Sequence, residues 1–155
     1  MARHETRPLQ GTSEAVAAEA IARAAHAGQA DKAGRPYVEH VRRVADAVDP
    51  ADVAVAWLHD VLEDTDVTAQ DLAAAGISPQ TIAAVEAITR RDGETSADYY
   101  RRVRANAAAL RVKASDIADN ASPERLAQLD DATRQRLTGK YTDARKALGI
   151  VDVPQ

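Results

Sequence analysis

The sequence predicts an all-α protein, a bundle of about eight or nine helices. Apolar residues recur at helical spacing along most of the chain, and no segment shows a convincing two-residue alternation of the kind that marks a strand. Although 45% of the 155 residues are hydrophobic, phenylalanine is absent and tryptophan occurs once. The core must therefore be built from alanine, valine, leucine and isoleucine, and alanine is the strongest helix former of all.

Helix-start and helix-stop signals divide the first third of the chain. Ser13 can cap a first helix, which Gly28 ends. A polar loop rich in turn-forming residues follows, and Pro36 at its end fits the first turn of a second helix. Asp49 and Pro50 stop that helix and open a third one, which is expected to continue through the apolar segment that follows.

The same signals divide the rest of the chain. Thr68, with Asp71 three residues on, resembles a capping box at the start of a short helix. The last helix is expected to end at Gly149. Between these points, further helices are expected to begin near Ser78, Thr95, Ala107, Ser122 and Asp130.

These helices are expected to form one domain over residues 12–150. Residues 1–11 are polar and are predicted to be a flexible N-terminal arm, and residues 151–155 a C-terminal tail. The chain start lacks the apolar core of a signal peptide, and no apolar run reaches membrane-spanning length. We therefore expect a cytoplasmic protein without a membrane partner.

Charge and composition limit the classes of partner and chemistry. The net charge is −4, which argues against a general nucleic-acid-binding protein. Cysteine is absent, which excludes disulfides, thiolate zinc sites and a cysteine nucleophile. A small-molecule partner is expected, and the sequence does not indicate the oligomeric state.

One short stretch gathers groups that could bind a metal ion. His59, the adjacent Asp60, and the carboxylates Glu63 and Asp64 lie within an apolar segment. In a helix, Asp60 lies three residues from Glu63 and four from Asp64, so these acids share one side. No lysine or arginine balances them between residues 53 and 68. The stretch is therefore either part of a metal site or a solvated acidic helix end.

Two other predicted helices carry candidate partners for this stretch. Lys113, Asp116 and Asn120 fall on one helix face at spacings of three and four. They form either part of a site or an exposed ion pair. His40, near the start of the second helix, is either a ligand or a structural histidine.

The order of these motifs is that of a known family. The motifs are Lys32-Ala33-Gly34-Arg35-Pro36-Tyr37 with His40, then Leu58-His59-Asp60-Val61-Leu62-Glu63-Asp64-Thr65, then Val112-Lys113-Ala114-Ser115-Asp116 with Asn120. In this order and over roughly residues 15–126, the chain resembles the HD-domain metal phosphohydrolases. Within them it is similar to the alarmone hydrolases of the RelA/SpoT type and their small single-domain relatives.

The resemblance implies an HD-domain helical bundle with one divalent metal ion, manganese in the alarmone branch, held by His40, His59, Asp60 and Asp116. It implies that the attacking water is positioned or deprotonated by Glu63 and Asp64. Substrate contacts are expected from Lys32, Lys113, Asn120 and Tyr141. A place near the metal shell is the alternative for Asn120, and packing of the last helix is an equal alternative for Tyr141. Family members with two metals use further histidines after the His-Asp pair, and no histidine follows residue 59 here.

The favoured function is a metal-dependent phosphohydrolase that removes the 3′-diphosphate of guanosine tetra- or pentaphosphate. One position departs from the family, because Asp31 stands where the relatives carry an arginine that helps to hold the base. Asp31 favours a first alternative, a hydrolase of another nucleotide or phosphorylated metabolite. A second alternative is a catalytically silent nucleotide-binding regulator.

A group of arginines has two open interpretations, either a phosphate-attracting rim or ordinary solvated charges. The group consists of Arg90, Arg91, Arg101, Arg102 and Arg104.

Overall fold

The computed structural model describes residues 12–150, and within them the all-α prediction is confirmed. The predicted arm and tail, residues 1–11 and 151–155, lie outside the described residues. The helices are α1 (Thr12–Ala25), α2 (Tyr37–Asp46), α3 (Val53–Leu58), α4 (Val61–Asp64), α5 (Ala69–Ala74), α6 (Pro79–Ile88), α7 (Ser96–Arg104), α8 (Ala107–Asn120), α9 (Pro123–Leu126) and α10 (Asp131–Leu148), with one 3₁₀ turn, η1 (Pro50–Asp52). None of these described helices is long and apolar enough to cross a bilayer.

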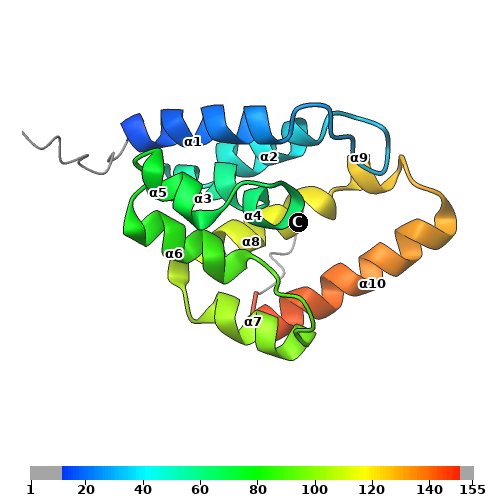
Figure 1. The fold of residues 1–155 in the computed structure, drawn as a ribbon. Helices are drawn as coiled ribbons and strands as arrows, with labels where there is room; N and C mark the ends of the chain where they lie inside the picture. The colour runs from blue at the N-terminus through cyan, green and yellow to red at the C-terminus, as the bar shows by residue number, and fades with distance from the viewer. Residues whose placement is uncertain (1–11, 151–155) are drawn as a thin grey trace, which may run out of the picture.

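Helix α3 forms the centre of the bundle. It packs against α1, α2, α6 and α8, which lie around it in Figure 1. Every residue from Ala54 to Leu58 is buried, including Trp57 at 4% exposure, which agrees with the absence of polar residues from this segment. Small residues allow the close approach of α1, because Ala18 and Ala22 are fully buried. Helices α7 and α10 pack together at the opposite side of the fold from α1 (Figure 1).

The third predicted helix is not continuous. It is divided into η1, α3 and α4, and α3 ends at Leu58, directly before the His-Asp pair. The backbone at Asp60 has φ −108° and ψ −1°. The regular α-helix is interrupted at His59 and Asp60 and resumes at Val61, where α4 begins. The hydrogen bond from the Asp64 N–H to the Asp60 carbonyl, at 3.0 Å, keeps the expected spacing of these two acids. The break therefore places His59 and Asp60 in a turn at the end of a buried helix.

The loop between α1 and α2 is closed on itself. The Tyr37 N–H donates to the Gln29 carbonyl at 2.9 Å, and the Asp31 N–H donates to the Arg35 carbonyl at 2.8 Å. Gly28, at φ +81°, makes the left-handed turn that leaves α1. This compact loop carries Lys32 and leads into the first turn of α2.

Several helix starts are formed by the residues that the sequence indicates. The Thr68–Asp71 capping box is present, and the N-cap side chains of Ser78, Thr95, Ser122 and Asp130 accept backbone N–H bonds. The first helix differs, because α1 begins at Thr12 and Ser13 lies inside it.

Candidate metal centre and substrate pocket

Four side chains from three separate segments meet in the interior. One comes from α2, two from the turn between α3 and α4, and one from α8. Their ligand atoms all lie within 4.8 Å of one another, in the set His40, His59, Asp60 and Asp116. Both histidines and Asp116 are buried, with exposures of 1%, 2% and 6%. The alternative of a solvated acidic helix end is therefore wrong for the His-Asp pair, whereas metal binding by these four residues stays a prediction.

The histidine nitrogens show that this cluster suits a cation. The Nδ1 of His59 lies 2.6 Å from the Ala56 carbonyl oxygen, so Nδ1 carries a proton, and in the neutral ring Nε2 keeps its lone pair. That Nε2 is buried without a hydrogen-bond partner, 2.9 Å from Asp60 Oδ2 and 3.4 Å from Asp116 Oδ1. A lone pair facing carboxylate oxygens is unfavourable unless a positive charge lies between them. Two imidazoles and two carboxylates suit Mn²⁺, Fe²⁺, Co²⁺ or Zn²⁺.

The second ring nitrogen of His40, Nδ1, contacts a carboxylate that the sequence analysis did not predict. The His40 Nδ1 lies 2.6 Å from Asp119 Oδ2, and the Arg43 Nε donates to Asp119 Oδ1 at 2.8 Å. Partial burial raises the pKa of Asp119, but the bonds from His40 and Arg43 outweigh it and lower this pKa to about 2. Such a carboxylate fixes the tautomer of a metal-binding histidine. Its position, three residues after Asp116 on the same helix, was the available signal.

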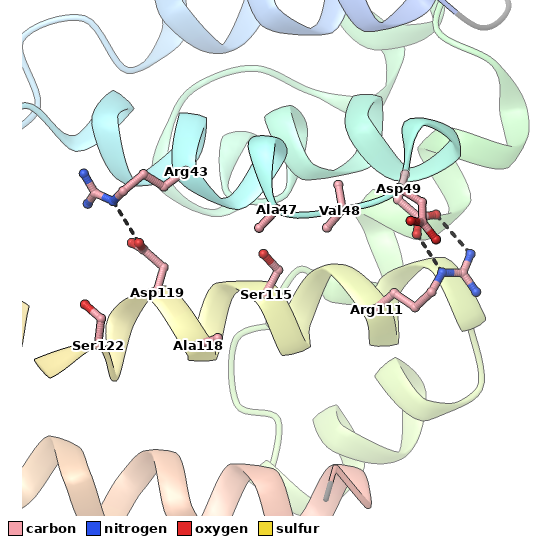
Figure 2. A pocket seen from close by; sticks show the side chains of 10 residues that line it. Arg43, Ala47, Val48, Asp49, Arg111, Ser115, Ala118, Asp119 and Ser122 are labelled. Atoms are coloured by element: carbon pink, nitrogen blue, oxygen red, sulfur yellow. Dashed lines mark hydrogen bonds and ion pairs between the residues drawn. The ribbon is translucent and has the colours of Figure 1, made fainter. Parts of the chain in front are cut away.

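Figure 2 shows this support from its outer side. A surface pocket of about 480 Å³ lies between α2 and α8, with the Arg43–Asp119 pair at one end. Arg111 lies at the other end. It donates to both oxygens of the buried Asp52, at 2.6 and 3.0 Å. Both arginines that line this pocket are thus paired with acids, and none of the predicted site residues lines it.

Replacing Asp119 with asparagine is expected to weaken metal binding about 10- to 100-fold, the usual cost of losing an outer-shell partner. Asparagine can still face His40, but it no longer carries the charge that stabilises the ring in its ligand tautomer. Metal affinity measured by competition with a chelator checks the effect. The matched control is Asp46→Asn, because Asp46 forms only an exposed pair with Arg42 on α2. Equal affinities for the two variants would show that Asp119 does not support the site.

A tyrosine supports the second ligand pair. The rings of Tyr37 and His40 lie 5.5 Å apart between centroids. In addition, the Tyr37 hydroxyl donates to Asp60 Oδ2. Burial first, and then the charges of Asp60 and its neighbours, raise the pKa of Tyr37 far above its ordinary value. The phenol therefore stays protonated and holds the Asp60 carboxylate in place.

Two of the predicted substrate contacts are bonded to a candidate metal ligand. The Lys113 Nζ lies 3.0 Å from Asp116 Oδ2, and the Asn120 Nδ2 donates to Asp116 Oδ1 at 3.1 Å. The ion pair of the alternative interpretation is thus present, but it is not exposed, because the side chain of Asp116 is only 9% exposed. Burial opposes the charge of Asp116, but Lys113 and the histidines hold its pKa well below the ordinary value.

The two candidate catalytic acids lie beside Asp60. Asp60, Glu63 and Asp64 each offer a carboxylate oxygen, all within 4.8 Å of one another. Glu63 Oε1 accepts the Arg90 N–H at 2.9 Å. Partial burial and the charges of Asp60 and Glu63 raise the pKa of Asp64 to about 6. A carboxylate that titrates near neutral pH is well suited to take a proton from water.

Comparison with known proteins relates this arrangement to a family. No family model matches the chain. It is 31% identical, in an alignment 130 residues long that covers 76% of this chain, to a probable guanosine-3′,5′-bis(diphosphate) 3′-pyrophosphohydrolase of Synechocystis sp.. The chain spans only 17% of that protein. A solved structure described as a metazoan ortholog of SpoT that hydrolyzes ppGpp superposes with a TM-score of 0.71 at 22% identity, covering 90% of this chain and 88% of the other. The chain is an HD-type, RelA/SpoT hydrolase-like domain.

The HD-type domain has a pocket next to the candidate metal centre. Its volume is about 280 Å³, and it is lined by three of the predicted substrate contacts, Lys32, Asn120 and Tyr141. Tyr37 lines the pocket too. Tyr37 and Asn120 are each hydrogen-bonded to a candidate metal ligand, which connects the pocket wall to the candidate metal centre. The structure thus places Tyr141 at a pocket wall, and it leaves Lys113 out of the pocket lining.

A positively charged cleft lies along α10, the helix that also carries Tyr141 of the pocket. Arg90, Arg136 and Lys140 line it. Partial burial, and then the charges of Lys113, Lys32, Arg90 and Arg136, lower the pKa of Lys140. Clustered cations attract anions such as phosphate.

The arginines of the predicted phosphate-attracting rim are not all placed at the basic cleft, and phosphate binding by them stays a prediction. Arg90 lines the basic cleft. Arg101 instead pairs with Asp98 on the exposed side of α7, at 3.0 Å. Arg102 pairs with Glu94 and donates to the Thr89 carbonyl. For these two arginines, the interpretation as ordinary helix charges holds.

The pH dependence of stability should report on the histidines of the HD-type domain. Burial lowers the pKa of His40 and of His59, but their carboxylate neighbours outweigh it and raise both values above 6.5. A histidine with a raised pKa stabilises the folded state below about pH 6.5, and this contribution is lost as the pH rises through the folded-state pKa. Metal-free protein should therefore lose thermal stability from about pH 6.5 upward, since the proton no longer offsets the carboxylates.

Mn²⁺ should reverse this loss, because a bound ion takes the place of the protons. The measurement is the melting temperature between pH 6 and pH 9, with EDTA and with Mn²⁺. The stabilisation by Mn²⁺ is expected to grow with pH, and a pH-independent difference would contradict the assignment. In His59→Ala protein the growth should be much smaller.

Proposed function

We propose that this HD-type domain, over residues 12–150, is a metal-dependent phosphohydrolase that acts on a phosphorylated nucleotide. The best candidate substrate is guanosine 3′,5′-bis(diphosphate), with its 3′-diphosphate as the group removed. The observation that carries the proposal is the meeting of the His40, His59, Asp60 and Asp116 side chains beside two further acids and a pocket. A cytoplasmic location and the absence of a nucleic-acid partner stay predictions.

The proposed division of labour follows from the contacts. A divalent ion held by the four ligands, Mn²⁺ by resemblance, would supply an acidified water and positive charge beside the phosphoryl oxygens. Asp64, with Glu63 beside it, would orient this water and take its proton. The water oxygen would bond to the phosphorus next to the ribose 3′-oxygen, and the bond between that phosphorus and the 3′-oxygen would break. The leaving 3′-oxygen would take up the proton that Asp64 accepted from the water, so that the products are guanosine diphosphate and pyrophosphate.

The positions of the pocket and the basic cleft support a substrate with two anionic ends. The pocket with Lys32, Asn120 and Tyr141 is next to the candidate centre and has room for a nucleoside. The cleft with Arg90, Arg136 and Lys140 provides positive charge for a second phosphate group. A nucleotide with diphosphates at both 3′ and 5′ positions would use both places.

The second candidate is a hydrolase of another nucleotide, because Asp31 lines the pocket where a cation would favour a polyanion. A silent nucleotide-binding regulator is the third. Against that one stands the complete set of four candidate ligands and two adjacent acids, which a silent protein does not need.

Product release from guanosine 3′,5′-bis(diphosphate) with Mn²⁺ tests the proposal, together with a panel of nucleoside mono-, di- and triphosphates. We expect guanosine diphosphate and pyrophosphate, and no products after EDTA. Turnover only of other nucleotides in the panel would mean that the substrate is one of these, and the metal-dependent mechanism would stand. Bound metal without turnover of any nucleotide would favour the silent regulator.

A further inference from the structure

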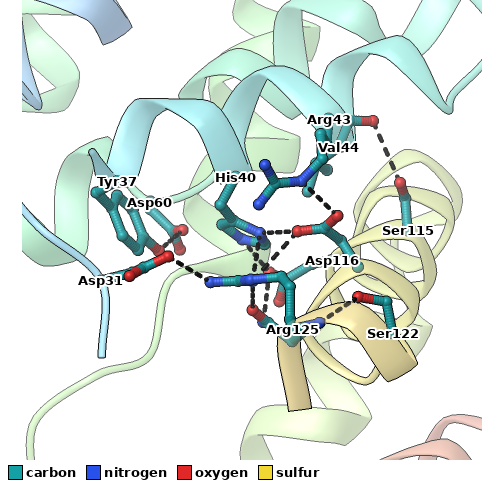
Figure 3. A network of polar contacts seen from close by, with 12 residues as sticks. Asp31, Tyr37, His40, Arg43, Val44, Asp60, Ser115, Asp116, Ser122 and Arg125 are labelled. Atoms are coloured by element: carbon teal, nitrogen blue, oxygen red, sulfur yellow. Dashed lines mark hydrogen bonds and ion pairs between the residues drawn. The ribbon is translucent and has the colours of Figure 1, made fainter. Parts of the chain in front are cut away.

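Arg125, in the short helix α9, is held by acceptors from the loop after α1 and from the end of α8 (Figure 3). Its Nη2 donates to Asp31 Oδ2 in the loop after α1, at 3.2 Å. Its Nη1 donates to Asp119 Oδ2 at 3.2 Å and to Asn120 Oδ1. The side chain is only 20% exposed, and it lines the substrate pocket. A cation is thus fixed in the pocket wall beside the candidate metal centre.

The two carboxylate oxygens of Asp31 have different partners. Its Oδ1 accepts the N–H groups of Ala33 and Arg35, both at 2.9 Å, and so ties the carboxylate to its own loop. Its Oδ2 is left for Arg125, and the Asp31 side chain is only 7% exposed. Burial opposes its charge, but the two N–H bonds and Arg125 lower the pKa of Asp31. Asp31 is therefore a charged anchor for Arg125, and its charge is not presented to the pocket as free repulsion.

The bonds of Arg125 decide what it can offer to a ligand. Both terminal nitrogens donate hydrogen bonds to protein acceptors, so most N–H donors along the edge of the guanidinium are occupied. What remains are its flat faces, and a guanidinium face stacks on aromatic rings and on nucleobases. The other walls of the pocket include Leu129, Leu137 and Tyr141, which also suit a flat apolar ring.

We propose that Arg125 holds the nucleobase of the substrate by stacking, and that Asp31 is the positioning residue that fixes Arg125. The proposal deepens the proposed function, on which it rests for the identity of the ligand as a nucleotide. It also removes the objection that an acid at position 31 disfavours a polyanion, because this acid is paired. Base selectivity is accordingly assigned to an arginine on α9, 94 positions along the chain from the loop that anchors it.

The test uses nucleotide binding, which does not depend on turnover. Dissociation constants of guanosine diphosphate and cytidine diphosphate are measured by calorimetry with the full chain. The two ligands carry the same phosphates, so their ratio reports on the base. A purine stacks over a larger face, and we expect wild-type protein to prefer guanosine diphosphate by about tenfold. Arg125→Lys keeps the charge but lacks the flat face, and its preference should fall to within about twofold.

Two further variants separate stacking from support of the metal centre. Arg43 also donates to Asp119 but is not among the residues that line this pocket, so Arg43→Lys should keep the tenfold preference. Asp31→Asn keeps an oxygen that can cap the loop and loses the charge toward Arg125, so the preference should be reduced to about threefold.

A wild-type protein without base preference, or an Arg125→Lys variant that keeps it, would overturn the assignment of Arg125. An unchanged preference in Asp31→Asn would overturn the positioning role of Asp31 alone. If the preference behaves as expected while no bis(diphosphate) is hydrolysed, the base site stands and the proposed reaction is wrong.

Discussion

Asp60→Ala protein is expected to lose metal binding and phosphohydrolase activity together. Asp60 Oδ2 lies 2.9 Å from His59 Nε2, at the centre of the candidate ligand set. Removing a direct ligand should cost more than the 10- to 100-fold that is usual for outer-shell partners. We therefore expect turnover to fall by more than about 100-fold and the bound metal to be lost on gel filtration. Metal analysis and a product assay on the same preparation check both effects.

Two controls keep this result interpretable. Asp60→Asn preserves an acceptor for the Tyr37 hydroxyl, so a failure caused only by misfolding should be milder in this variant. Asp66→Ala removes an exposed acid six positions along the chain and should bind metal like the wild type. Full metal content in Asp60→Ala would remove Asp60 from the ligand set.

Asp64→Asn protein is expected to keep its metal and to lose turnover by about 10²- to 10⁴-fold, the usual contribution of a general base. Its carboxylate lies within 4.8 Å of Asp60 and Glu63, and partial burial with their charges raises its pKa to about 6. Because only the carboxylate accepts a proton, wild-type activity should rise with pH through about 6. This limb of the profile of kcat/KM should be absent from Asp64→Asn protein.

Glu63→Gln is the matched comparison. Glu63 Oε1 accepts the Arg90 N–H, a bond that the glutamine oxygen can preserve, so we expect a smaller loss of turnover with the metal retained. Glu63→Ala breaks that bond as well and should remove most of the turnover. Wild-type rates in both Asp64→Asn and Glu63→Ala would mean that neither acid activates the water.

The helices follow from local signals, which explains why most of them could be predicted. Thr68, Ser78, Thr95, Ser122 and Asp130 act as N-caps in the structure because capping depends only on the next three residues. The break between α3 and α4 carries no such signal. The apolar pattern continues through His59 and Asp60, and the turn there is set by the segments packed around it.

The candidate site was predictable where motifs carry it and not where distant residues pair. His40, His59, Asp60 and Asp116 belong to short motifs whose order indicates the chemistry. The bond from Tyr37 to Asp60 joins residues 23 positions apart, and that from Arg125 to Asp31 joins residues 94 apart. No local sequence pattern indicates either of these two pairs. Asp31 in particular looked unfavourable in the sequence, because its partner lies on another helix.

The number of divalent ions bound per chain tests the central claim most directly. Mn²⁺ is titrated into metal-free wild-type protein at neutral pH, and the stoichiometry is read by calorimetry. One cluster of two histidines and two carboxylates predicts one tightly bound ion per chain, with binding abolished in His59→Ala. No tight binding, two tight ions, or unchanged binding in His59→Ala would contradict a single metal centre at His40, His59, Asp60 and Asp116.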